Sequence, residues 1–191
     1  TIPLAANDRV KNILELIKSN KFMGTVSISK GASTDDILEI KEGFTTRIKP
    51  HPEFLKQVNI KNLVMNDVQV LMLEGAPSTV GEINYFLEKN FENKNDAIIV
   101  ARSFPEEVIA TLAVNWNKRS LRVIPVIYGH DVYSINSLRD LQAVIGGSPY
   151  TSKLGDNMER ISSLDRCANI DKLQIFSDRC ILNKKNVNIK I

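Results

Sequence analysis

Residues 97–115 read AIIVARSFPEEVIATLAVN and combine a short apolar run with a helical pattern. The run from Ala97 to Ala101 has the length and composition of a buried strand. Ser103 and Glu106 then have the spacing of a capping box, in which a hydroxyl and a carboxylate satisfy unpaired backbone N–H groups at a helix start. Pro105 is tolerated in a first helical turn, where a missing N–H has no partner to lose. The stretch therefore predicts a strand followed closely by a helix.

The predicted helix has a wider apolar arc than one buried face requires. Val108 and Leu112 share one direction, and we expect them to be core residues. Ile109, Ala113 and Val114 point toward a second direction. This surplus has two explanations. Either the helix is packed on two sides by its own domain, or it forms one side of an exposed groove that binds other proteins.

A second helical pattern, at residues 79–91, shows the same surplus. Ile83 and Phe86 point one way, whereas Leu87 and Phe91 point another, with Asn84 beside them. Both explanations remain open for this helix.

Alternating strand and helix patterns extend on both sides of these segments. Apolar runs occupy residues 68–74 and 121–128, and a further helical pattern at 135–145 stops at Gly146-Gly147. Weaker strand signals follow at 173–176 and 180–182. We therefore expect an α/β fold with a mostly parallel sheet, flanking helices and additional β elements.

The amino-terminal part has a different organisation. Residues 7–19 have the pattern of an amphipathic helix, and residues 25–29 and 37–40 alternate like two strands. In the segment KPHP, residues 49–52, two prolines disfavour regular helix and favour an extended or turning path.

Composition excludes several classes of function. The 191 residues have a net charge of only +3, and the basic residues are scattered, so nucleic-acid binding gains no support. We expect no membrane span and no signal peptide, hence a soluble, intracellular protein. Cys167 and Cys180 lack the spacing of a zinc site and are expected to be reduced and at least partly buried.

Catalytic and cofactor motifs are missing from the sequence. His51 and His130 lie far apart, neither in a nucleophile motif, so no catalytic residue and no metal ligand is assigned. The loops after the strands match no phosphate-binding pattern. The alternative to protein binding is a small-ligand-binding or catalytic α/β domain that uses loops at the strand carboxyl ends, at residues 75–78 and 102–105.

Residues 97–115 resemble the strand and helix at the centre of the apical domain of GroEL-type group I chaperonins. The resemblance continues in the same order along the chain. Residues 5–33 are similar to an intermediate-domain helix and strand, and EGF at 42–44 is similar to the hinge. Two later segments also match, SLRDLQAVIGGSPYTSKLG at 137–155 and LDRCANIDKLQIFSD at 164–178. It implies an apical-domain-like fold in residues 42–191, preceded by an ascending intermediate-domain segment in residues 1–41. The family's nucleotide loops have no counterpart here.

The resemblance also implies a function, capture of non-native polypeptides by apolar side chains exposed between two helices and an extended segment. Carried onto this sequence, the binding residues are Pro52, Glu53, Phe54, Asn84, Leu87, Phe91, Ile109, Ala113 and Val114, with Gly43 as the hinge.

Partners implied in the same way are a co-chaperonin mobile loop and a homo-oligomeric parent ring, while this chain alone is expected to be monomeric. ATP and Mg²⁺ would bind to the parent ring, and no cofactor is expected in this chain. A cytoplasmic location is expected, in the host cytoplasm if the gene is phage-encoded.

Four positions depart from the family pattern. Asn84 stands where a leucine is usual, Glu53 and Lys49 where aromatics are usual, and Ala113 where a valine is usual. A more polar and shallower groove is expected, in an unusual lineage that is phage-encoded or organellar.

Overall fold

The computed structural model describes Lys11, Glu15 and Lys18 and residues 43–46, 48–129, 132–151, 161 and 163–184. The chain divides into two compact units, Thr1–Ile40 and Lys41–Ile191. In the first unit, Lys11, Glu15 and Lys18 are helical and exposed. The rest of the helix expected at 7–19 and the strands expected at 25–29 and 37–40 lie outside the described residues.

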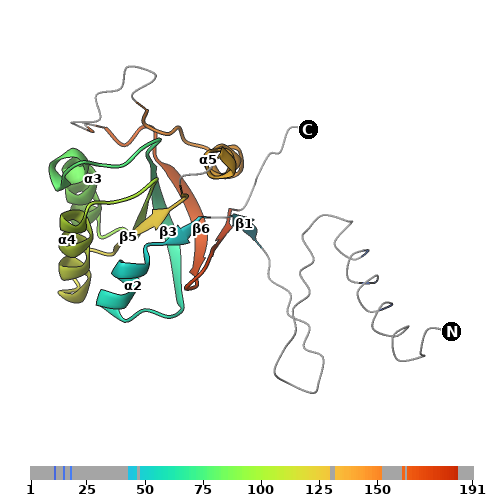
Figure 1. Ribbon diagram of the computed structural model, residues 1–191, viewed down its shortest axis with the longest axis horizontal. Coiled ribbons are helices and arrows are strands. Elements are labelled where there is room, and N and C mark those ends of the chain that lie inside the picture. The colour runs from blue at the N-terminus through green and yellow to red at the C-terminus, as the bar shows by residue number, and fades with distance from the viewer. Residues whose placement is uncertain are drawn as a thin grey trace. The chain divides into compact units, whose positions relative to one another are not determined.

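One sheet of seven strands forms the centre of the second unit, in the order β1-β7-β6-β3-β4-β5-β2 (Figure 1). The strands are β1 Phe44–Thr46, β2 Lys49–Pro50, β3 Leu63–Met72, β4 Ala97–Ala101, β5 Val123–Ile127, β6 Ala168–Ile175 and β7 Cys180–Asn183. The expected α/β class is confirmed.

The sheet is mixed, and its parallel part is smaller than expected. β3, β4 and β5 pair in parallel, whereas β1–β7, β7–β6, β6–β3 and β2–β5 are antiparallel. The physical reason lies in the connections. Only a few residues join β6 to β7, which suffices for a hairpin, whereas parallel neighbours need a crossover of the length that α3 and α4 provide. The apolar pattern located these strands without giving their direction.

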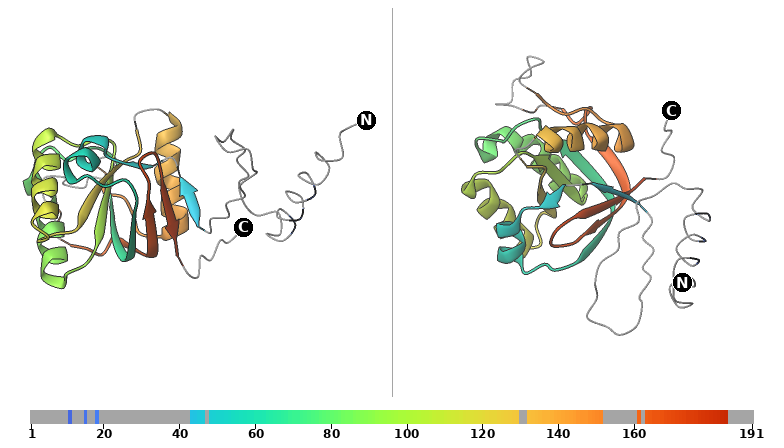
Figure 2. Two further views of the ribbon diagram at one scale, coloured as in Figure 1. Left: turned by 90° about the horizontal axis from the view of Figure 1, so that it is seen from below. Right: turned by 45° about the vertical axis from the view of Figure 1, so that its right-hand side comes forward.

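Four helices are described around the sheet: α2 Pro52–Val58, α3 Val80–Asn93, α4 Glu106–Asn117 and α5 Val132–Ile145. α4 contacts both α3 and α2, while α5 contacts β1 and β6. Figures 1 and 2 show α3 and α4 side by side on one side of the sheet and α5 on the other. Every residue of β4, the central parallel strand, is buried, so both faces of that strand are covered.

The core contains the residues assigned to the inner direction of each helix. Val108, Leu112, Ile83 and Phe86 are at most 1% exposed, as the apolar periodicity predicted.

The segment after β2 differs from the sequence-based expectation. Pro52 occupies the first position of α2, so Pro52, Glu53 and Phe54 are helical rather than extended. Proline is favourable there because the first helical N–H has no intrahelical partner and the fixed φ suits the helix. Pro52 therefore starts a helix, whereas Lys49 and Pro50 are extended in β2, as expected.

Candidate functional site

The candidate site lies on three neighbouring helices, with α4 between α3 and α2. The α2–α4 contact is specific, since the Phe54 ring meets the Trp116 ring edge-on at a centroid distance of 6.0 Å. The Asn117 amide Nδ2 also donates a hydrogen bond of 3.4 Å to the Gln57 carbonyl oxygen. These contacts fix which flank of α4 faces α2.

Phe91 on α3 and Val114 on α4 are exposed apolar side chains. Phe91 exposes 58% of its surface and Val114 exposes 50%, although most apolar residues of the two helices are buried. Phe91 follows Leu87 by one helical turn and Asn84 by two turns, so the three share one flank of α3. A third exposed hydrophobic residue, Val64, lies on β3. Two adjacent helices thus each present an apolar side chain to solvent.

Four of the expected contact residues are buried, which corrects their assignment to an open groove. Phe54, Leu87, Ile109 and Ala113 are 0%, 6%, 1% and 2% exposed, respectively. Ile109 and Ala113 lie on the same flank of α4 as Trp116, which packs against α2. For these residues, the second apolar direction serves packing within the domain.

The remaining expected residues are on the surface. Pro52, Glu53 and Asn84 are exposed, as are Phe91 and Val114. The Asn84 amide Nδ2 donates a hydrogen bond of 2.7 Å to Glu88 Oε1, and the Glu53 carboxylate lies 4.0 Å from Lys56 Nζ. The exposed part of the predicted site therefore combines two apolar side chains with a polar periphery.

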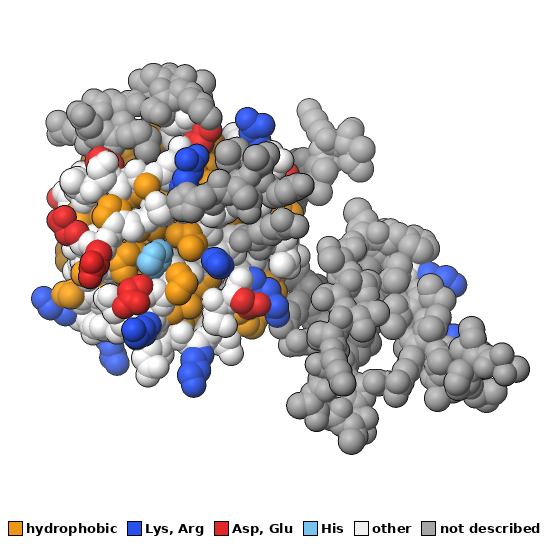
Figure 3. All heavy atoms as spheres, viewed as in Figure 1, with side chains coloured by type: hydrophobic (Ala, Val, Ile, Leu, Met, Phe, Trp, Pro, Cys, Tyr) orange, Lys and Arg blue, Asp and Glu red, His pale blue; other side chains and the backbone are white. Residues whose placement is uncertain are grey.

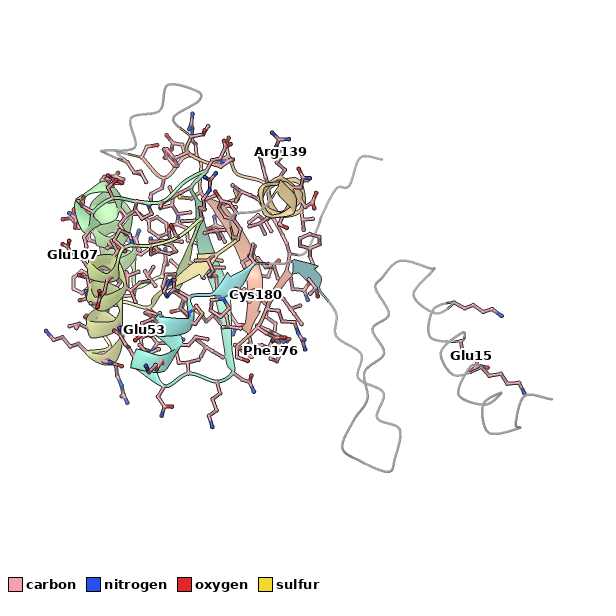
Figure 4. All side chains as sticks on the ribbon, viewed as in Figure 1. Glu15, Glu53, Glu107, Arg139, Phe176 and Cys180 are labelled. Atoms are coloured by element: carbon pink, nitrogen blue, oxygen red, sulfur yellow. The ribbon has the colours of Figure 1, made fainter. Side chains whose placement is uncertain are left out.

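Three residues of this surface were missed by the sequence analysis. Trp116 lies seven residues after Ile109, a spacing that could have placed it on the same flank. Glu88 on α3 and Glu107 on α4 are exposed carboxylates, and a search restricted to apolar residues passes over them. Figure 4 shows Glu107 beside α4 and Glu53 on α2.

The face in Figure 3 shows hydrophobic side chains gathered around a histidine, with acidic groups beside them. Among the described residues that histidine is His51, whose backbone N–H donates to the Pro125 carbonyl oxygen at 2.8 Å. Its ring meets the Phe104 ring edge-on at 6.3 Å. Desolvation lowers the pKa of His51, against an opposing effect of the nearby Glu53 carboxylate. His130 lies outside the described residues.

The loops at the strand carboxyl ends are packed against one another. The Arg102 N–H donates a hydrogen bond of 2.7 Å to the Gly75 carbonyl oxygen, and Pro77 and Phe104 are buried there. A hollow of about 260 Å³ lies near the opposite end of β4, lined by Asp67, Asn95, Asn169, Ile170, Asp171 and Lys184. The loops proposed for a small ligand therefore gain no support from the structure.

Gly43 has a conformation that favours glycine. Its φ is +138°, and a Cβ atom there would lie 2.6 Å from Ile181 Cγ2 and 2.9 Å from the Leu182 carbonyl oxygen. Close approach to β7 thus explains this glycine locally, beside the hinge role expected from the resemblance.

Cys167 is half-buried and Cys180 is buried, and both are free thiols. Desolvation raises the pKa of each to about 12. Within the described ranges, no group of three or more His, Cys, Asp or Glu side chains has the arrangement of a metal site. No described helix is long and apolar enough to cross a membrane.

Comparison with known proteins identifies chaperonin homologues. No family model matches the chain. It is 26% identical over 161 residues to the mitochondrial chaperonin CPN60-1 of Cucurbita maxima, covering 83% of this chain and 28% of that protein. It is 28% identical over 139 residues to the mitochondrial CPN60 of Euglena gracilis, covering 72% of this chain and 24% of that protein. With the GroEL chaperonin of Mycoplasma pneumoniae it shares 27% identity over 143 residues, covering 73% of this chain and 26% of that protein.

The chain spans about a quarter of the length of these curated relatives. Among solved structures, the open-state monomer of a group II chaperonin from Methanococcoides burtonii matches 76% of this chain and 35% of its own, with 9% identity and a TM-score of 0.41.

Proposed function

We propose that residues 42–191 are an apical domain that binds non-native polypeptides, because most of this chain is homologous to GroEL and CPN60 chaperonins. The observation that carries this proposal is the exposure of Phe91 and Val114 on the adjacent helices α3 and α4. Apolar side chains exposed on neighbouring helices are typical of surfaces that bind other proteins.

The proposed roles differ between exposed and buried residues. Phe91 and Val114 contact the polypeptide directly, and Pro52, Glu53 and Asn84 form the periphery of the contact. Phe54, Leu87, Ile109 and Ala113 support the surface from below, because their burial holds the helices in place. Covering the exposed parts of Phe91 and Val114 would remove roughly 200 Å² of apolar area from water and contribute about 5 kcal/mol before ordering costs.

The wider assignments follow the same homology. Residues 1–41 would form the ascending intermediate-domain segment, and Gly43 the hinge at its junction with the apical domain. A parent ring in the cytoplasm would supply ATP and Mg²⁺ binding. A co-chaperonin mobile loop would use the surface formed by α3 and α4 and displace the bound polypeptide.

Suppression of aggregation tests this proposal. We expect the chain to slow light scattering by a thermally unfolding client protein, and the double variant Phe91→Ser and Val114→Ser to lose most of this protection. Val64→Ser is the matched control, since Val64 is 52% exposed on β3 and its substitution removes a similar apolar side chain elsewhere. Circular dichroism shows whether each variant is folded. Full protection by a folded double variant, or equal loss in the Val64→Ser control, contradicts the assignment.

A further inference from the structure

The first half of β3 has a neighbouring strand on only one of its two edges. β6 pairs with β3 between Leu63 and Val70, whereas β4 pairs with it only from Gln69 to Met72. On the β4 side, the Gln69 N–H donates a hydrogen bond of 2.9 Å to the Asp96 carbonyl oxygen. Among the described residues, no backbone hydrogen bond joins residues 63–66 to a segment on that side. This edge therefore has strand N–H and C=O groups available for pairing.

Side chains along this edge are exposed. Val64 exposes 52% of its surface, and Asn66 and Asp67 after it are also exposed. Lys61, just before the strand, is exposed as well. An unpaired strand edge that carries an exposed apolar side chain is a place where a further strand can add to a sheet.

Two opposite charges flank Val64 at equal distances along the chain. Lys61 lies three residues before it and Asp67 three residues after it. Within the described ranges, neither side chain belongs to an ion pair. In an antiparallel pairing of two copies centred on Val64, each Lys61 is opposite the partner's Asp67, and the two Val64 side chains are opposite each other. A parallel pairing in register would instead place like charges together. The edge is therefore complementary to itself in one orientation.

Charges on an edge strand often serve to prevent pairing with other strands. That explanation suits charges of one sign, which repel a second copy in every orientation. Lys61 and Asp67 have opposite signs, so the antiparallel pair attracts. Asp67 also limits the contact, because its φ of +51° interrupts the regular strand and leaves only residues 63–66 as a straight free edge.

We propose that two copies of the chain associate weakly through this edge of β3, in an antiparallel pairing centred on Val64. The inference is independent of the proposed function, since it uses no residue of α3 or α4. A contact of four strand residues is far smaller than a standard interface of about 1,600 Å², so the dissociation constant is on the order of 0.1 mM. The chain is then mostly monomeric at micromolar concentrations.

A cysteine at position 64 tests the geometry. Opposed residues of an antiparallel pair have Cβ atoms about 5 Å apart, close to the separation in a disulfide. At about 0.1 mM protein with oxidised glutathione, Val64→Cys should therefore form an intermolecular disulfide, measured on a non-reducing gel. Val114→Cys is the control, because Val114 is 50% exposed on α4, and it should form at least fivefold less dimer. Equal crosslinking of the two variants, or none at position 64, overturns the inference.

Sedimentation equilibrium tests the association without a crosslink. We expect the unmodified chain to form a dimer as its concentration rises to about 0.5 mM. Lys61→Glu places two carboxylates opposite each other and should raise the dissociation constant at least about fivefold. Lys49→Glu makes the same change in charge at an exposed position of β2 and should leave the constant unchanged.

Circular dichroism shows whether both charge variants are folded. A chain that remains a monomer at every concentration overturns the inference, as does an equal weakening of association by Lys49→Glu and Lys61→Glu.

Discussion

At the scale of single residues, Gly43 has a role that the backbone alone defines. Its φ of +138° and the 2.6 Å that would separate an added Cβ from Ile181 Cγ2 both oppose any other residue. Gly43→Ala should therefore lower the free energy of unfolding by about 2 kcal/mol or more, measured by urea titration. Gly75→Ala is the control, because no atom lies within 4 Å of a Cβ there. Unchanged stability of Gly43→Ala would remove the packing explanation and leave the hinge role to account for this glycine.

The two thiols provide a second test at this scale. The pKa of both Cys167 and Cys180 is raised to about 12 by burial, so at pH 8 roughly one molecule in ten thousand carries either thiolate. We expect negligible labelling by iodoacetamide in the native protein and labelling of both cysteines in urea, followed by mass spectrometry. Rapid labelling of native Cys180 would contradict its burial in β7.

At the scale of elements, His51 immediately precedes α2, and its ring packs edge-on against Phe104. Burial lowers the pKa of His51 in the folded protein below the ordinary value of 6.5, so the unfolded chain binds a proton more readily. The stability from this site is present above about pH 6.5 and is lost as the pH falls through the folded-state pKa.

Fluorescence of Trp116, the single tryptophan of the chain, reports on this element because its ring contacts Phe54 of α2. In a series of urea titrations at different pH values, we expect the urea concentration at the unfolding midpoint to decrease as the pH is lowered below 6.5. This decrease should be less steep in His51→Gln. An identical slope in the variant would show that other groups cause the acid sensitivity.

Element boundaries show where sequence patterns were sufficient. The apolar run at 97–101 gave β4 correctly, because its residues are all buried and have no alternative face. The capping patterns were less informative. α4 begins after Pro105 rather than at Ser103, and neither Thr79 nor Pro105 makes a side-chain cap hydrogen bond. Glu82 Oε2 accepts a hydrogen bond from the Ser78 N–H at 2.8 Å instead. Local spacing located each start to within a few residues and left its hydrogen bonds undetermined.

At the scale of the whole molecule, periodicity established that α3 and α4 have surplus apolar surface, but not how that surface is divided. Ile109 and Val114 belong to the same surplus, yet α2 covers the flank that contains Ile109 and leaves Val114 exposed. That division depends on a contact between segments about sixty residues apart, such as Asn117 with Gln57. A pattern read along one helix contains no information on it.

The small size of the exposed apolar surface leads to a prediction about assembly. About 5 kcal/mol of burial, reduced by ordering costs, implies a dissociation constant no tighter than about 0.1 mM for one copy and one apolar segment. Linking copies makes the second contact intramolecular, so two copies joined by a flexible linker should bind a client with two apolar segments at least tenfold more tightly than one copy does. A client with one such segment should gain about twofold at most, because it offers no second contact. Calorimetric titration of both clients against single and tandem chains measures these ratios. An equal gain for both clients would mean that the linker creates a new site, and that the surface of α3 and α4 does not act through multiple weak contacts.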